Sequence, residues 1–190
     1  MDGGLIVRLH VGCGDILLVG YTNIDIQGKY VYESYHNEIQ DNLTTLDNYF
    51  KYPFGTKRRS IIVDKKMDLL KKWDYEDESI EEIVMISCLE HFSKNEGEHI
   101  IGEIKRVLMP KGKAIIDIPD IQEQIRKFYY TNPYWMMTLV YCNGKNPYSF
   151  HRYGYTKRTF EELWGKNYIV QEQNIVNHDY PMLQFEVIKK

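Results

Sequence analysis

Two glycines and one aspartate have the types and spacing that point most directly to chemistry in this chain. Gly12 and Gly14 flank Cys13 directly after a short apolar run, and glycine there lets a ligand approach the backbone without meeting a Cβ atom. Asp25 lies at the end of the next apolar stretch, "NIDI", where a carboxylate can accept hydrogen bonds from both hydroxyls of a ribose. This combination predicts a site for an adenosine-containing ligand without phosphates; a plain tight turn and a solvated aspartate are the alternatives.

The segment between the glycines and Asp25 limits which nucleotide could bind. Residues 15–22 are too few for a helical crossover, which usually needs about a dozen residues. A third glycine is also missing, so the helix N-terminus that holds pyrophosphate in dinucleotide sites is poorly supported. The pattern therefore disfavours a nicotinamide-dependent oxidoreductase, which is one rival interpretation.

Apolar runs and helical periodicities predict the elements that position these residues. We expect strands at residues 5–11, 23–26, 60–64, 80–88, 113–119, 167–176 and 181–190. Pro53 and Gly55 break the pattern before the third strand. We expect helices after Tyr35, from about residue 95 until Pro110 and Gly112 stop the helix, and at 121–130, 134–141 and 157–165, with a loop at 143–156.

This order of elements predicts an α/β fold. Strands that alternate with helices form a mostly parallel sheet covered on both faces, here closed by an antiparallel pair at the C-terminal end. Ligands of such sheets bind beyond the carboxyl ends of the strands, which directs attention to residues 12–15, 25, 64–69, 88–91 and 119–120. A length of 190 residues without repeats or a linker predicts a single domain over residues 1–190.

Composition excludes several classes of protein. The net charge of −3 and the lack of a basic stripe, apart from "KRR" at 57–59, disfavour a nucleic-acid partner. Three widely spaced cysteines without a CxxC pair indicate a reducing compartment. No apolar run has transmembrane length and no signal peptide is evident, so we expect a cytoplasmic protein.

Four ordered motifs carry a resemblance to a known family. They are "LHVGCGDILLVGYTNIDI", "DLLKKWDYEDESIEEIVMISCLEHF", "EIKRVLMPKGKAIIDIPD" and "VYCNGKNPYSFHRYGYTKRTFEELW". Together they resemble the small class I S-adenosylmethionine (SAM)-dependent methyltransferases of the Methyltransferase-11-like group, over roughly residues 5–190. The resemblance implies a Rossmann-like fold with a reduced first crossover helix, which agrees with the short segment after Gly14.

Three parts of the sequence depart from the family pattern. The P-x-G-G turn reads Pro110-Lys111-Gly112-Lys113, so Lys113 replaces its last glycine; residues 71–73 read Lys-Lys-Trp where the family has Leu-Pro-Phe, and Glu82 replaces an aspartate. The second departure could alter the wall on the adenine side. None of the three removes a group that methyl transfer needs.

The resemblance implies SAM as the cofactor, with S-adenosylhomocysteine as its product. Val11, Gly12, Cys13 and Gly14 would pack under the methionine portion, and Asp25 would hold the ribose with Ile26 against the adenine. Asp68 and Leu69 would contact the adenine, with Asp64 as the weaker alternative. Cys88 and Leu89 would lie beside the sulfonium.

Transfer to an alcohol requires a base that takes the acceptor's proton. The candidates are His91, His151 and Asp120, each following a predicted strand or lying in the aromatic loop. The alternatives are a loop-ordering role for His91 and a helix cap for Asp120. Asp117 and Asp120 could contribute to a magnesium site but need not converge, so we predict no metal.

The acceptor is inferred by analogy. Relatives with this pattern are often associated with surface polysaccharides and glycan building, and the aromatic segment 128–155 suits a sugar. We expect O-methylation of a sugar hydroxyl in a glycan or nucleotide sugar. O- or N-methylation of another small metabolite, or a non-catalytic binding module, are the alternatives, and the oligomeric state stays open.

Overall fold

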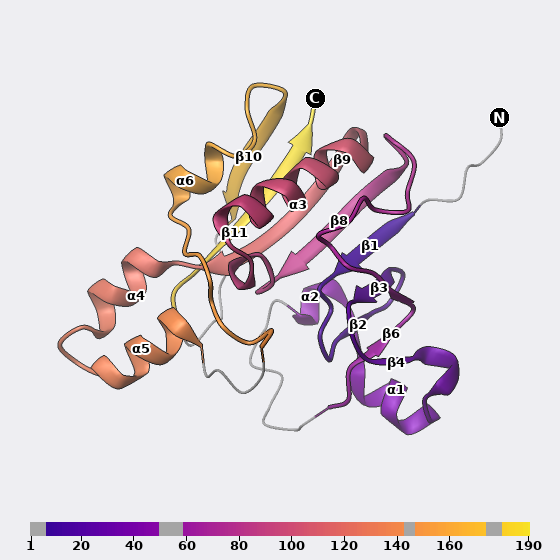
Figure 1. Cartoon of the computed structure of the whole chain (residues 1–190), viewed down its shortest axis with the longest axis horizontal. Coiled ribbons are helices and arrows are strands. Elements are labelled where there is room, and N and C mark those ends of the chain that lie inside the picture. Colours follow the sequence, from indigo (N-terminus) through magenta and orange to yellow (C-terminus); the bar gives the residue numbers. More distant parts are fainter. Residues whose placement is uncertain (1–6, 50–58, 143–146, 174–179) are drawn as a thin grey trace.

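The computed structural model describes residues 7–49, 59–142, 147–173 and 180–190. Its centre is a seven-stranded sheet with the order β10-β11-β9-β8-β1-β3-β7 (Figure 1). The strands are β1 (Arg8–Val11), β3 (Thr22–Asp25), β7 (Lys65–Lys66), β8 (Ile80–Ile86), β9 (Leu108–Pro119), β10 (Tyr168–Gln173) and β11 (Met182–Lys189). Only β11 runs antiparallel to its neighbours β9 and β10. The predicted α/β class, with a mostly parallel sheet and an antiparallel C-terminal pair, is confirmed.

One face of the sheet is covered by α3 (Lys94–Val107), as Figure 1 shows. The helix begins with a capping box in which Ser93 and Glu96 satisfy each other's backbone N–H groups. Ile100, Ile104 and Val107 recur at helical spacing and are completely buried. They pack into the main hydrophobic core together with alternate residues of the strands.

The opposite face carries a smaller apolar cluster. Val84 and Ile86 of β8 pack there with Tyr49, whereas Ile83 and Met85 face the main core, as the two-residue period of a strand requires. No helix lies between β1 and β3; that segment holds only β2 (Leu17–Leu18). The predicted short crossover is confirmed.

A later segment of the chain packs beside this short crossover. Its elements are α1 (His36–Asn42), β5 (Leu43–Thr44) and α2 (Leu46–Tyr49), of which β5 pairs in parallel with β2. Tyr49 at the end of α2 then fills the space against the sheet.

Two predicted boundaries are wrong. Residues 60–64 do not form the third strand of the main sheet: β6 (Ile62–Val63) pairs with β4 (Lys29–Tyr30) in a separate ribbon, and β7 takes the edge position. Asp64 explains the bend, because its carboxylate accepts a hydrogen bond from the backbone N–H of Asn23 at 2.8 Å and so uses a position that a ladder bond would occupy.

The second correction concerns the end of α3. Pro110 and Gly112 do not stop the helix, which ends at Val107, but lie in an irregular part of β9. The register against β8 shifts there, and Lys111 has a φ of +66°. Proline is tolerated at such a bulge because the ladder is already interrupted.

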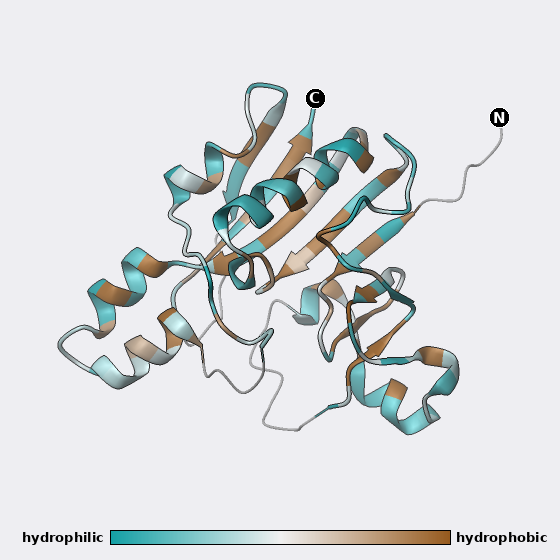
Figure 2. Cartoon of the chain, viewed as in Figure 1, coloured by the Kyte–Doolittle hydropathy of each residue, from teal (hydrophilic) through white to brown (hydrophobic). Residues whose placement is uncertain are grey.

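The remaining helices surround the C-terminal half. α4 (Ile121–Phe128) and α5 (Pro133–Tyr141) pack against each other and extend away from the sheet (Figure 1). α6 (Lys157–Glu161) is shorter than predicted, and two 3-10 turns, η1 (Val31–Glu33) and η2 (Leu89–His91), complete the described elements. Figure 2 shows hydrophobic residues gathered on the central strands and hydrophilic ones on the outer side of α3.

Some predictions fall on residues that lie outside the described ranges. These are the start of the first strand at 5–6, the turn at Pro53 and Gly55, the basic residues 57–58, the first part of the loop at 143–146, and the strand end at 174–176. Among the described residues, no helix is long and apolar enough to cross a bilayer.

Candidate active site

The strand order reverses between β1 and β8. From β1 the chain builds outward through β3 to β7 and then returns to the other side of β1 to form β8. Open α/β sheets bind ligands at the carboxyl ends of the strands on either side of such a reversal. A cavity of about 480 Å³ lies there, within the usual size range of small-molecule sites.

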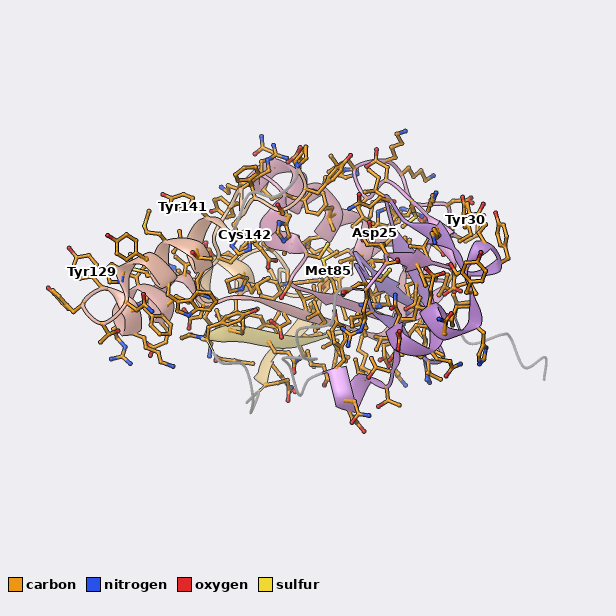
Figure 3. All side chains as sticks on the ribbon, turned by 90° about the horizontal axis from the view of Figure 1, so that it is seen from below. Asp25, Tyr30, Met85, Tyr129, Tyr141 and Cys142 are labelled. Atoms are coloured by element: carbon orange, nitrogen blue, oxygen red, sulfur yellow. The ribbon has the colours of Figure 1, made fainter. Side chains whose placement is uncertain are left out.

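Most of the predicted site residues line this cavity. Among its lining residues are Gly12, Gly14, Asp25, Ile26, Asp68, Leu69, Cys88 and His91. Cys142, at the end of α5, also lines it, and Figure 3 shows that residue between Tyr141 and the part of the molecule that carries Asp25. The cavity is thus bounded by the sheet edge on one side and by Cys142 and the loop residues Pro147–Ser149 and Arg152 on the other.

Glycine is needed at the two positions of the turn for different structural reasons. Both have φ in the left-handed region, +64° for Gly12 and +54° for Gly14. A Cβ on Gly12 would lie 2.1 Å from Sγ of Cys88, whereas a Cβ on Gly14 would meet nothing within 4 Å. Gly12 therefore allows the ends of β1 and β8 to approach each other, and Gly14 leaves an open backbone surface toward the cavity.

The turn also fixes the orientation of Asp25. One carboxylate oxygen accepts a hydrogen bond from the N–H of Gly14 at 3.1 Å, and the other accepts from the N–H of Gln27 at 3.2 Å. Each oxygen keeps a lone pair for a ligand hydroxyl. Asp64, the alternative acid, instead accepts hydrogen bonds from the backbone and side chain of Asn23 and does not line the cavity.

Three predicted cofactor residues do not line this cavity. Val11 and Leu89 are completely buried in the main core, so only their backbones could serve a ligand. Cys13 lines a smaller cavity of about 220 Å³ together with Tyr49 and Asp117. Burial raises the pKa of the Cys13 and Cys88 thiols, which keeps both protonated at neutral pH.

Several cavity residues were given no individual role in the sequence analysis. Met67, Ser87, Tyr148 and Arg152 all line it. Ser87 has a φ of +47°, a strained conformation for a residue other than glycine, and no pattern in the sequence signals it. Arg152 could have been found, because it directly follows His151 in the motif that carries the family resemblance.

A cluster of three titratable side chains lies beside the cavity, which one of them, His91, lines. Glu90 and His91 belong to η2, and His151 reaches them from the loop after α5. Nε2 of His151 lies 3.9 Å from a carboxylate oxygen of Glu90, and the rings of His91 and His151 are 5.0 Å apart. The structure therefore brings together the two histidines that the sequence named separately.

Burial shifts the protonation of the whole cluster. It raises the pKa of Glu90 to about 8 and lowers the pKa of His91. Burial and the neighbouring His91 lower the pKa of His151 to about 4, although backbone carbonyls of Leu139 and Val140 act in the opposite direction. At neutral pH both imidazoles are neutral, which is the form that can accept a proton or bind a metal ion.

Among the described residues, the other candidate residues do not line the cavity. Asp120 caps α4, because its carboxylate accepts the N–H of Glu123 at 2.9 Å, and it does not line the cavity. His10 is completely buried; its Nδ1–H donates to the side-chain oxygen of Asn23 at 3.0 Å. His178 lies outside the described residues.

Comparisons with known proteins agree with this geometry. A family model described as a methyltransferase domain matches residues 9–116, which is more than half of the chain. The chain belongs to this family. It is a SAM-dependent methyltransferase domain, and the predicted cofactor class is confirmed. A search of curated proteins found no match.

Solved structures show the same fold. The PH0226 protein from Pyrococcus horikoshii OT3 is 16% identical with a TM-score of 0.54, over 97% of this chain and 82% of that one. A chain from the complex of the Haloferax volcanii Trm112 activator with a methyltransferase is 11% identical with a TM-score of 0.55, over 97% and 82%. A SAM-dependent methyltransferase from Methanosarcina mazei is 16% identical with a TM-score of 0.50, over 95% and 89%.

The residues of the cavity fit this cofactor. Gly14 presents its backbone to the cavity without a side chain. The carboxylate of Asp25, which the N–H of Gly14 holds in place, keeps lone pairs that can accept hydrogen bonds from a ligand. When bound, SAM supplies a methyl group on a positively charged sulfur, which an acceptor atom can displace. The chain itself has to hold the donor, orient the acceptor and handle its proton.

Proposed function

We propose that this methyltransferase transfers the methyl group to a hydroxyl of a sugar, in a glycan or a nucleotide sugar. Asp25 would hold the two ribose hydroxyls, with Ile26, Asp68 and Leu69 around the adenine. The backbone of residues 11–14 would lie under the methionine portion, and Cys88 beside the sulfur. The lining of the cavity by Gly12, Asp25, Asp68 and Cys88 together supports this division of roles.

We further propose that a histidine accepts the proton of the acceptor, and that His91 is this base. The observation that carries the proposal is the orientation of the ring. His91 lines the cavity, and its Nδ1–H donates to the backbone carbonyl of Phe150 at 3.0 Å. That bond fixes the tautomer in which Nε2 carries the lone pair. Because the pKa of His91 is lowered, the ring stays unprotonated at pH values at which an ordinary histidine begins to bind a proton.

Aromatic side chains near the cavity support a sugar as the acceptor. Tyr148 lines the cavity and is 56% exposed, and Phe150 and Tyr141 nearby are also exposed. Such rings can stack on the C–H face of a sugar while polar groups bind its hydroxyls. This support is by analogy, since fold alone does not determine an acceptor.

The acceptor is tested by a screen with isotope-labelled SAM. Nucleotide sugars, short oligosaccharides, and non-sugar alcohols and amines are incubated with the full chain, and products are identified by mass spectrometry. We expect label on a sugar oxygen. Label on amines or non-sugar alcohols alone would overturn the sugar assignment and leave the methyltransferase activity in place.

The base is tested with His91→Asn. We expect turnover to fall by about 100-fold or more, as for the loss of a general base, with S-adenosylhomocysteine binding unchanged because the donor contacts lie elsewhere. His99→Asn is the matched control, since His99 is exposed on α3. Normal turnover of His91→Asn would reject His91 and favour His151.

A further inference from the structure

The Glu90–His91–His151 cluster has the composition and spacing of a metal site. One donor atom from each residue lies within 4.8 Å of the other two. In a tetrahedral site with metal–nitrogen bonds near 2.05 Å, donor atoms are about 3.4 Å apart. The donors would therefore approach one another by up to about 1.4 Å on binding, which rotation of side chains can provide.

The buried carboxyl group of Glu90 is only partly satisfied by hydrogen bonds. The residue is 2% exposed, and one of its oxygens has no hydrogen-bond partner among the described residues. The separation of 3.9 Å from His151 is too long for a hydrogen bond. A buried carboxyl group without partners is costly, and a bound cation would supply the missing partner.

His91 is oriented as metal-ligating histidines are. Nδ1–H of His91 donates to the carbonyl of Phe150 at 3.0 Å, and ligating histidines commonly donate their second ring N–H to a backbone carbonyl in this way. His151 is held close to Glu90 by the main chain, because the N–H groups of Arg152 and Tyr153 both donate to the carbonyl oxygen of Glu90 at 2.8 and 3.2 Å. The backbone thus fixes the cluster before any ion binds.

We propose that Glu90, His91 and His151 bind one divalent transition-metal ion. Two imidazoles and a carboxylate favour zinc, manganese, iron or cobalt over calcium and magnesium. Three protein ligands leave coordination positions open, and because only His91 of the three lines the cavity, we place these positions on the cavity side.

The ion would give the site a second way to activate an acceptor, an inference that rests on the proposed function. A hydroxyl bound at an open position becomes more acidic, as water does on zinc. Nε2 of His91 is then a ligand and no longer a base, so the proton goes to solvent. A metal-dependent and a metal-independent enzyme can therefore be distinguished by experiment.

Binding is tested first. Full-length protein treated with a chelator and dialysed is titrated with Zn²⁺, Mn²⁺ and Co²⁺ by calorimetry, with visible absorption of Co²⁺ as the spectroscopic readout. We expect one ion per chain. Glu90→Gln and His151→Asn should each weaken binding by about 100-fold, and His99→Asn should not change it. Thermal unfolding and S-adenosylhomocysteine binding confirm that the variants are folded.

The outcomes separate the two proposals. No saturable binding of any of the three ions, or binding that neither variant weakens, overturns the metal site. Undiminished turnover in the presence of chelator overturns the role of the ion in activation and leaves the proposed methyl transfer intact. One-to-one binding that both variants abolish, together with no methylation of any acceptor, supports the site and rejects the proposed function.

Discussion

The glycine turn and the Glu90–His91–His151 cluster follow neighbouring strands of one sheet, yet different parts of the chain hold them in place. At the turn, backbone groups do the positioning: two left-handed glycines and the N–H of Gly14, which binds Asp25. In the cluster, buried side chains from distant segments meet, and one carboxylate oxygen of Glu90 lacks a partner among the described residues. The turn therefore depends on main-chain geometry, and the cluster depends on side-chain identity.

This difference teaches what substitutions should do in each region. A change at the turn alters the path of the backbone, so stability and cofactor binding should fall together. A change in the cluster replaces one side chain in an environment fixed by η2 and the loop that follows α5, so the fold should persist while the chemistry is lost. The predictions below test that contrast.

Gly12→Ala should give the largest effect. The left-handed φ costs a non-glycine residue about 1–2 kcal/mol, and the new Cβ would also lie 2.1 Å from Sγ of Cys88, an overpacking of about 1–3 kcal/mol. We expect the free energy of unfolding in urea to fall by about 2–5 kcal/mol. Gly14→Ala is the matched control, because it has the same strain with open space, and should lose only about 1–2 kcal/mol. Equal losses would show that the contact with Cys88 does not matter.

Asp25→Ala should remove cofactor binding with a smaller effect on stability. Hydrogen bonds to a charged group contribute about 1.5–3 kcal/mol each, so losing the hold on the ribose should weaken S-adenosylhomocysteine binding by about 100-fold or more, as measured by calorimetry. Asp74→Ala, at an aspartate whose side chain is 94% exposed, is the control. Binding within about threefold of the wild type would reject Asp25 as the ribose ligand.

The turn could be predicted from the sequence because its signals are local. The signals lie within one short stretch that contains Gly12, Gly14 and Asp25. The glycines indicate an unusual backbone conformation, and the aspartate indicates a hydrogen-bond acceptor. The missing crossover helix follows from the same stretch, since residues 15–22 cannot span it. The strand at Ile80–Ile86 was equally readable, because residues 83–86 form a continuous apolar run, as is typical of a buried central strand.

The cluster could not be predicted as a unit. His91 binds the carbonyl of Phe150 across 59 positions of the chain, and nothing in either segment indicates that they meet. Glu90 reads as an ordinary surface residue until the fold buries it. Asp120 shows the converse problem: an acid after a strand and before a helix fits both a catalytic residue and a cap, and the structure shows the cap. The error at residues 60–64 has a similar cause, because the carboxylate of Asp64 accepts a hydrogen bond from the N–H of Asn23, 41 positions away.

A third prediction concerns His10, a buried histidine in the strand that leads into the glycine turn. His10 precedes the glycines in β1, binds Asn23 and lies edge-on to the ring of Tyr49. Burial lowers its pKa to about 4, compared with about 6.5 in the unfolded chain. Between these values the unfolded state binds more protons, so stability must fall as the pH drops from 6.5 toward 4.

The loss due to His10 should reach about 2 kcal/mol between pH 7 and pH 5. His10→Gln lacks the titrating ring but can still donate to Asn23, so its unfolding free energy should depend less on pH by that amount. Urea unfolding at both pH values measures the difference, and the other histidines cancel because both proteins contain them. His99→Gln, at an exposed position, should retain the wild-type dependence. If His10→Gln retained it as well, the acid sensitivity would have to come from His91 and His151, and the cluster would then govern stability as well as chemistry, contrary to the contrast drawn above.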